Sequence, residues 1–186
     1  MISNRAKAGF DKSFFRSLEE SLRTETSPAW HIQSISSAAI DAKHFIMLTI
    51  SSFDFRLIVL LHFSTEKAAY EYIAVNLKIP VNELTFSRYQ DSLSETGNLL
   101  CGTLKRLLFQ AYPHLGMSSP NHLNLDSLKY IDSVKIDTSI HFNAKSERGA
   151  SFYGSLYISA VGNLDFDPTA LTETEENVEM GALELF

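Results

Sequence analysis

The sequence predicts a single α+β domain in which helices pack against a largely antiparallel sheet. Helical patterns dominate residues 10–22 and 83–112, whereas runs typical of strands dominate residues 44–63 and 134–160. Helices and strands therefore occur in separate groups and do not alternate along the chain, which is typical of the α+β class. A length of 186 residues favours one domain with a sizeable core.

The first third of the chain predicts one helix and a hairpin. Four apolar residues recur at every fourth position and indicate an amphipathic helix that ends before Ser27-Pro28: Phe10, Phe14, Leu18 and Leu22. Residues 31–39 fit either a short strand or irregular structure. Two apolar, β-rich runs, 44–51 and 55–63, are separated by a short turn and predict a hairpin at the centre of the sheet.

Two helices follow the hairpin. Ser64 or Thr65 is placed to cap the first, and Pro80 ends it. Asn82 is placed to cap a longer helix from about Glu83 to Tyr112. The prolines and glycine between residues 113 and 120 predict a loop after this helix.

The last third predicts a second pair of strands. Apolar and polar residues alternate from Val134 to Phe142, which indicates a half-exposed strand. Residues 147–149 form the expected turn, and residues 152–160 return as the partner strand. We place the domain at residues 1–164 and an acidic extension at 165–186. Residues 171–186 contain five glutamates and no basic residue.

Composition excludes several classes of function. A net charge of −6 gives no basic surface typical of nucleic-acid binding, and no apolar run approaches the roughly 20 residues that span a bilayer. No signal-peptide pattern occurs, so we expect a cytoplasmic protein. The six histidines are dispersed, and Cys101 has no paired base nearby in the sequence. We therefore expect neither a metal site nor a cysteine nucleophile.

The long helix has two opposite faces. At about 100° per residue, one side is apolar and is expected to face the core: Tyr89, Leu93, Leu100, Leu104, Leu107 and Ala111. The other side is polar: Asp91, Glu95, Asn98, Gly102 and Lys105. A glycine inside a helix costs about 1 kcal/mol relative to alanine. Gly102 is therefore expected to admit another molecule, and Gly97 to allow close packing on the buried side.

The spacing of these polar residues is distinctive. An isolated Glu-x-x-Asn pair occurs by chance in many helices. Here Asp91 precedes Glu95 by four residues, Asn98 follows, and Pro120 comes after a loop. This pattern resembles the signature of the CheC/CheX/FliY chemotaxis phosphatases, although the proline falls about one position early. Thr96 also departs from the pattern, because the family usually has an apolar residue there.

The resemblance covers roughly residues 10–160 and has clear implications. Only one copy of the motif is found, because the first helix has no matching asparagine, so the chain is more similar to CheX than to CheC. The family resemblance implies a phosphatase that acts on the aspartyl phosphate of a CheY-like receiver domain. Glu95 is implied to engage the receiver's lysine, and the chain is implied to form a homodimer.

The chemistry of the motif fits this activity. A carboxamide accepts one hydrogen bond and donates another, so Asn98 can hold a water in line with the phosphorus–oxygen bond. Asp91 is expected to support docking at the rim, and Gly102 is expected to let the partner approach the helix backbone. The chain itself is expected to bind no metal or other cofactor, because Mg²⁺ arrives with the receiver.

Two alternatives remain open from the sequence. A CheX-like domain can bind a phosphorylated response regulator as an adaptor without fast hydrolysis, and the Thr96 departure leaves this possible. A structural component of the flagellar switch is the other, because the middle domain of FliM shares the fold. The presence of both Glu95 and Asn98 disfavours that second alternative.

Overall fold

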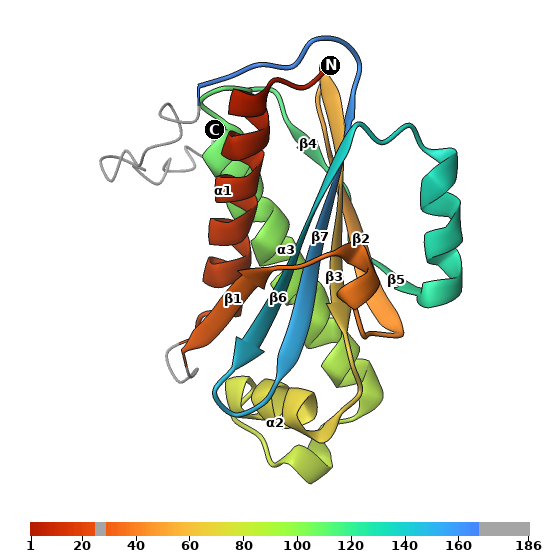
Figure 1. Cartoon of the computed structure of the whole chain (residues 1–186). Helices are drawn as coiled ribbons and strands as arrows, with labels where there is room; N and C mark the ends of the chain where they lie inside the picture. Colours follow the sequence, from red (N-terminus) through yellow and green to blue (C-terminus); the bar gives the residue numbers. More distant parts are fainter. Residues whose placement is uncertain (25–28, 168–186) are drawn as a thin grey trace, which may run out of the picture.

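The computed structural model describes residues 1–24 and 29–167, and it confirms the α+β class (Figure 1). A seven-stranded antiparallel sheet has the order β1-β6-β7-β3-β2-β4, with β5 also pairing with β2. The strands are β1 (Trp30–Ser34), β2 (His44–Ser51), β3 (Phe55–Phe63), β4 (Gly116–Met117), β5 (Asn121–Asn124), β6 (Thr138–Ser146) and β7 (Ser151–Ala160). The α-helices are α1 (Asn4–Leu22), α2 (Lys67–Asn76) and α3 (Phe86–Leu108). Short 3-10 helices are η1 (Ser37–Ala39), η2 (Val81–Glu83) and η3 (Leu125–Ser133).

The predicted hairpin is confirmed, and its two strands span the predicted residues 44–51 and 55–63. β2 and β3 pair antiparallel, and β3 also pairs with β7 along its whole length, from Phe55 with Ala160 to Phe63 with Phe152. β3 is therefore central, and eight of its nine residues are buried. β2 lies one place further out, next to the short strands β4 and β5. The ambiguous segment after residue 30 forms the strand β1 and then η1.

Helix boundaries differ from the prediction at each helix. α1 begins at Asn4 because the Ser3 side chain accepts a hydrogen bond from the Ala6 N–H at 3.0 Å. The predicted caps of α2 are wrong: its N-cap is Glu66, which makes no side-chain capping bond. Asn82 is also not a cap, because it lies in η2; Thr85 caps α3 instead, accepting from the Arg88 N–H at 3.3 Å. Ser3 and Thr85 are of the residue types preferred at N-caps, whereas α2 begins without a side-chain cap.

Two predictions in the last third also need correction. The stretch predicted as a loop contains β4, and β5 follows directly after Pro120; both strands pair with β2. Such short strands carry no readable period. The strand predicted to start at Val134 begins at Thr138. Val134 and Ile136 alternate with polar residues because they pack on a small apolar cluster around Phe45 and Leu60. Their pattern is therefore a sign of burial and not of strand pairing.

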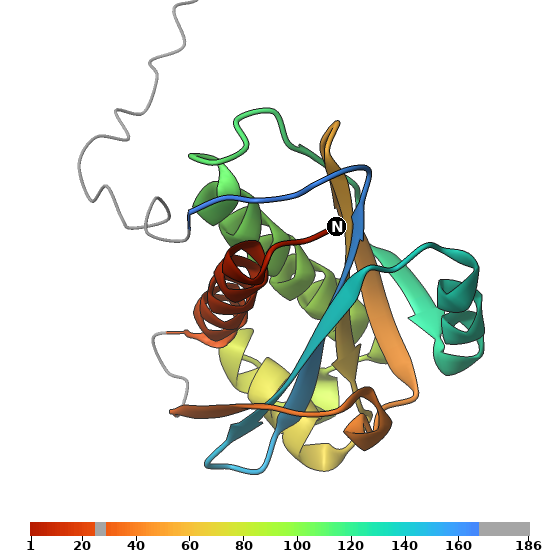
Figure 2. The same ribbon diagram turned by 45° about the horizontal axis from the view of Figure 1, so that its top comes forward.

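The two faces of the sheet are covered differently. α1 and α3 lie side by side on one face, over the larger core, whereas η3 covers part of the other face (Figures 1 and 2). The chain after β7 returns to the start of α1, where Phe166 stacks edge-on against Phe10 at 5.1 Å and Asp165 pairs with Arg5. Residues 168–186, most of the predicted acidic extension, lie outside the described residues. No helix in the described ranges is long and apolar enough to cross a membrane.

Candidate functional site

Helix α3 is held rigidly against the sheet and α1 by its apolar face. Tyr89, Leu93, Leu100 and Leu104 have no exposed surface, as the sequence predicted. A Cβ atom on Gly97 would lie 3.1 Å from Cδ1 of Leu48 and 3.5 Å from Cγ2 of Ile46. Gly97 therefore lets the helix approach β2 closely, and the predicted reason for this glycine is confirmed.

The predicted site residues share the opposite face of α3. Asp91 and Glu95 are exposed, and Asn98 and Gly102 are half-buried. They follow one another at steps of four, three and four residues, so their side chains lie in one row along the helix. Within residues 1–24 and 29–167, the side chains of Glu95 and Asn98 have no hydrogen-bond or ion-pair partner. Both are thus positioned by the backbone and remain available to a second molecule.

The fold also brings the predicted proline near this helix. Ser94 Oγ and His122 Nε2 are 2.7 Å apart, which links α3 to β5, and Pro120 lies two residues before His122. Asn98 lies one turn after Ser94. Sequence reasoning missed His122, because the contact joins elements that are separated by a loop and has no spacing signal. After α3 ends, the chain therefore comes back to the same helix at β5, just after Pro120.

Thr96, at a position where the family usually has an apolar residue, finds a hydrogen-bond partner within the helix. Its hydroxyl donates a hydrogen bond to the Ser92 carbonyl at 3.0 Å, one turn earlier. A half-buried polar group is costly only when it lacks a partner. The hydroxyl therefore leaves the course of α3 and the direction of Glu95 and Asn98 unchanged.

Charge is sorted along the exposed face of α3. The acidic residues Asp91 and Glu95 precede Asn98, whereas Lys105 and Arg106 follow it in the last turn. Glu20 of α1 accepts from Arg106 at 2.9 Å and from Arg16 at 2.8 Å, so Arg106 is fixed between the two helices. Cations in the last turn also favour the helix through its dipole. The face is therefore acidic at one end and basic at the other.

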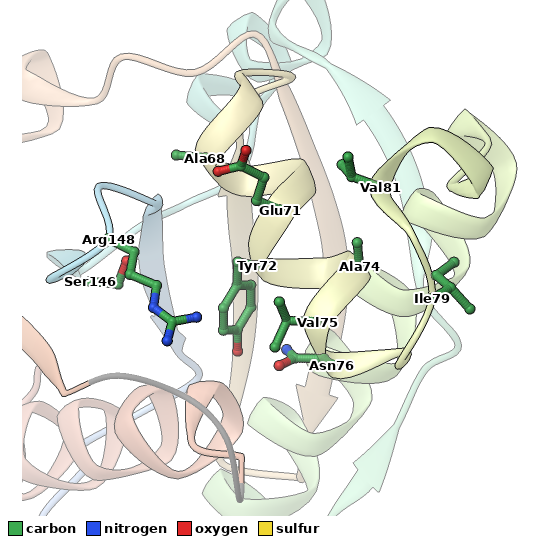
Figure 3. A pocket seen from close by; sticks show the side chains of 10 residues that line it. All are labelled: Ala68, Glu71, Tyr72, Ala74, Val75, Asn76, Ile79, Val81, Ser146 and Arg148. Carbon is green, nitrogen blue, oxygen red and sulfur yellow. The ribbon is translucent and has the colours of Figure 1, made fainter.

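The site is a helix face and not a cavity. The pocket in Figure 3 has a volume of about 300 Å³ and contains none of the predicted site residues. It lies along α2 and the β6–β7 turn, where Tyr72 and Val75 line it and Arg148 lies at its edge. A flat, rigid row of polar side chains suits contact with a macromolecule better than capture of a small substrate.

Other chemistry at this helix is limited. Burial raises the pKa of the Cys101 thiol to about 12, so the thiolate is scarce at neutral pH. Cys101 also has no exposed surface and packs in the core. Among the residues that the structure describes, no three His, Cys, Asp or Glu side chains gather into a group that could hold a metal ion.

Several solved structures with this fold are chemotaxis proteins. A chemotactic CheC-like protein from Shewanella oneidensis MR-1 has a TM-score of 0.65 at 16% identity, covering 82% of this chain and 99% of its own. The chemotaxis protein CheX from Vibrio vulnificus has a TM-score of 0.61 at 17% identity, covering 81% and 99%. The CheX–CheY–BeF₃–Mg²⁺ complex from Borrelia burgdorferi matches with a TM-score of 0.58 at 12% identity, covering 82% and 96%.

These likenesses show that the chain has the α+β fold of the CheC/CheX chemotaxis proteins. The resemblance drawn from the motif is thus confirmed at the level of the fold. No family model and no curated protein sequence matches the chain. The fold is also shared with FliM: the FliM–SpeE complex from H. pylori matches with a TM-score of 0.51 at 10% identity, covering 81% and 84%.

Proposed function

We propose that this chain is a CheX-like phosphatase that hydrolyses the aspartyl phosphate of a CheY-like receiver domain. The observation that carries the proposal is the placement of Glu95 and Asn98, unpaired among the described residues, on the exposed face of a helix whose other face is buried. A domain of the same fold has been crystallised with CheY, which supports a receiver as the partner. Rigid support of this kind is what precise positioning requires.

Asn98 positions the attacking water in this proposal. Its Oδ1 accepts a hydrogen bond from the water, and its Nδ2 donates one to a phosphoryl oxygen. The water oxygen bonds to phosphorus while the bond from phosphorus to the aspartyl oxygen breaks, leaving a free carboxylate and inorganic phosphate that keeps the protons of the water. The transition state is loose, so orientation contributes more than a strong base does.

Glu95 sets the register of docking. Its carboxylate forms a charge-assisted contact with the receiver's lysine, which otherwise pairs with the phosphate. Asp91 contacts the receiver at the rim, and Gly102 lets the receiver approach the helix backbone; neither takes part in the chemistry. Mg²⁺ is supplied by the receiver, and the phosphatase chain contributes no metal ligand. We also propose that the protein acts in the cytoplasm as a homodimer.

Phosphate release from acetyl-phosphate-labelled receiver domains of the same organism tests the proposal. The wild-type chain should accelerate the loss of phosphate, and Asn98→Ala should abolish the acceleration while the unfolding transition stays unchanged. Asn82→Ala, which removes an exposed asparagine in η2, is the matched control and should keep the wild-type rate. An Asn98→Ala variant that is as active as wild type would show that this row of residues is not the site.

The second candidate is a non-catalytic module that binds a phosphorylated response regulator. The likeness to FliM favours it, because FliM has this fold and was crystallised in a complex with another protein, SpeE. The same experiment separates the two functions: an adaptor binds the labelled receiver but leaves its rate of phosphate loss unchanged.

A further inference from the structure

The pocket beside α2 is lined mainly by apolar side chains, and two of them are left in contact with solvent (Figure 3). Val75 of α2 and Val81 of η2 are 41% and 43% exposed. Apolar side chains exposed around a hollow are typical of a surface that another group covers. The volume of about 300 Å³ is at the lower end for ligand pockets, so it suits a few side chains of a peptide. The apolar lining consists of Ala68, Tyr72, Ala74, Val75, Ile79 and Val81.

The charged residues of this pocket leave a positive charge without a partner. Glu71 and Arg148 both line the pocket, and Glu71 is paired with Lys67, whose Nζ lies 3.4 Å from Glu71 Oε1. Arg148 is exposed in the β6–β7 turn and forms no hydrogen bond or ion pair with any described residue. Its side chain extends from the turn toward Tyr72 (Figure 3). The pocket therefore suits an occupant that is apolar and also carries carboxylates.

The acidic extension of the same chain has this composition. Residues 168–186 lie outside the described residues, and the segment 171–186 contains five glutamates and no basic residue. Large apolar side chains alternate with these acidic residues toward the end of the segment: Val178, Met180, Leu183, Leu185 and Phe186. The extension thus carries both groups that the pocket lacks, and its charge is opposite to that of Arg148.

The extension is also long enough to reach the pocket. It starts near the first turn of α1, where Asp165 pairs with Arg5. The pocket lies near the other end of α1, because the Tyr72 hydroxyl donates to the Leu22 carbonyl at 2.8 Å. The 19 residues of α1 span about 28 Å. The eleven residues from Asp167 to Val178 span up to about 36 Å when extended, so the apolar end of the extension reaches this distance.

We propose that the pocket beside α2 binds the acidic extension of its own chain. Apolar side chains from residues 178–186 enter between α2 and η2, and glutamates of the extension pair with Arg148. A tethered segment has an effective concentration in the millimolar range, so a contact of low intrinsic affinity is enough. The pocket contains none of the residues of the proposed catalytic row, so this inference goes beyond the proposed function and does not depend on it.

Hydrogen exchange of the full chain tests the role of Arg148. Amides in residues 178–186 should exchange more slowly than a random coil in the wild type. Arg148→Glu should raise their rates by up to about tenfold, because a charge-assisted contact becomes a repulsion. Arg88→Glu makes the same change of charge at an exposed position of α3 and should leave the rates unchanged. Equal exchange in the wild type and Arg148→Glu would overturn the proposal.

Disulfide trapping tests the place of the extension directly. Val75→Cys combined with Leu183→Cys should form an intramolecular disulfide when the full chain is incubated with oxidised glutathione. The native Cys101 is buried and does not compete. Val161→Cys with Leu183→Cys is the matched control, because Val161 is 78% exposed and lies only six residues before the extension. An undocked extension would link to position 161 at least as fast as to position 75.

The outcomes identify the occupant. Faster linkage at position 75 than at position 161, within one chain, supports the proposal. Linkage at position 75 between two chains would assign the pocket to the extension of a second copy and overturn it. Equal or faster linkage at position 161 would show that the extension does not dock at α2. Each result is obtained without a receiver domain, so it leaves the phosphatase proposal to its own experiment.

Discussion

The two residues of the proposed catalytic pair on α3, Glu95 and Asn98, differ in their exposure to solvent. Asn98 is half-buried, which restricts the positions its amide can take, whereas Glu95 is exposed and surrounded by water. An exposed carboxylate contributes through a partner charge, and salt screens that contribution. The two residues should therefore respond differently to ionic strength even though they lie only one turn apart.

Glu95→Gln tests this difference because it removes the charge and keeps the size of the side chain. At low ionic strength we expect kcat/KM for dephosphorylation to fall roughly tenfold, since a charge-assisted hydrogen bond is replaced by a neutral one. The gap to wild type should narrow as salt is added. Glu147→Gln in the β6–β7 turn is the control. Equal salt dependence for wild type and Glu95→Gln would argue against a lysine partner for Glu95.

A buried histidine gives a second prediction at this scale. His62 has no exposed surface; its Nε2 lies 3.0 Å from Ser155 Oγ, and its Nδ1 has no hydrogen-bond partner within the described residues. Burial and, to a smaller extent, electrostatic repulsion by His141 lower the pKa of His62 from 6.5 to about 4. The folded state thus resists protonation of His62. The free energy of unfolding therefore loses nothing to His62 above pH 6.5, and it decreases as the pH falls from 6.5 towards 4.

The expected loss between these two pH values is roughly 3 kcal/mol in the free energy of unfolding. Urea denaturation at pH 7.5, 5.5 and 4.5 measures it. His62→Gln retains a hydrogen-bond donor for Ser155 and should flatten the pH dependence, whereas His114→Gln, at an exposed position, should not change it. An unchanged pH dependence in His62→Gln would mean that another group is responsible.

At the scale of the element, α3 has a tightly packed side and an open side. Gly97 lies on the packed side and Gly102 on the open side. Gly97 lies against Leu48, where an added side chain meets an atom at 3.1 Å, and Gly102 meets nothing within 4 Å. The same helix therefore resists substitution on one face and accepts it on the other.

Gly102→Ala should raise the free energy of unfolding by about 1 kcal/mol, because alanine favours the helix and meets no obstacle. Gly97→Val should lower it by roughly 1–3 kcal/mol, because its branched side chain overpacks the contact with β2. Thermal unfolding of both variants checks the pair. A loss of stability in Gly102→Ala would show that the open face is covered in the free protein.

At the scale of the whole molecule, the sheet has edges that can accept another chain. β1 pairs only with β6 among the described strands, so its second side is unpaired. Unpaired edges favour association of two copies. We expect sedimentation at tens of micromolar, a usual range for specific association, to give a dimer. A monomer mass at every concentration in this range would contradict the homodimer.

The acidic extension is predicted to be weakly held on the body or on a neighbouring subunit. Burying two or three of its apolar side chains, at roughly 1.5–3 kcal/mol each, just offsets ordering at about 1–2 kcal/mol per residue. Hydrogen exchange of residues 179–186 should therefore show weak protection. Random-coil rates there, with unchanged assembly and activity after deletion of residues 168–186, would remove any role for the segment.

The sequence by itself determined the fold class, the central hairpin and the orientation of α3. The hairpin is readable because two apolar runs of strand length flank a turn, and the helix is readable because Tyr89, Leu93 and Leu100 repeat with the helical period. The same period places Glu95 and Asn98 on the exposed side. These properties are local, since each depends on residues within a few turns of one another.

Only the tertiary structure decided which segments meet. The pairing of β4 and β5 with β2, the contact between Ser94 and His122, and the ion pair between Glu20 and Arg106 join distant parts of the chain. The starts of the helices also required it, because Asn82 is by residue type the better cap and yet lies in η2, so that Thr85 caps α3. Long-range contacts have no period along the sequence, so their partners appear only when the core has been assembled.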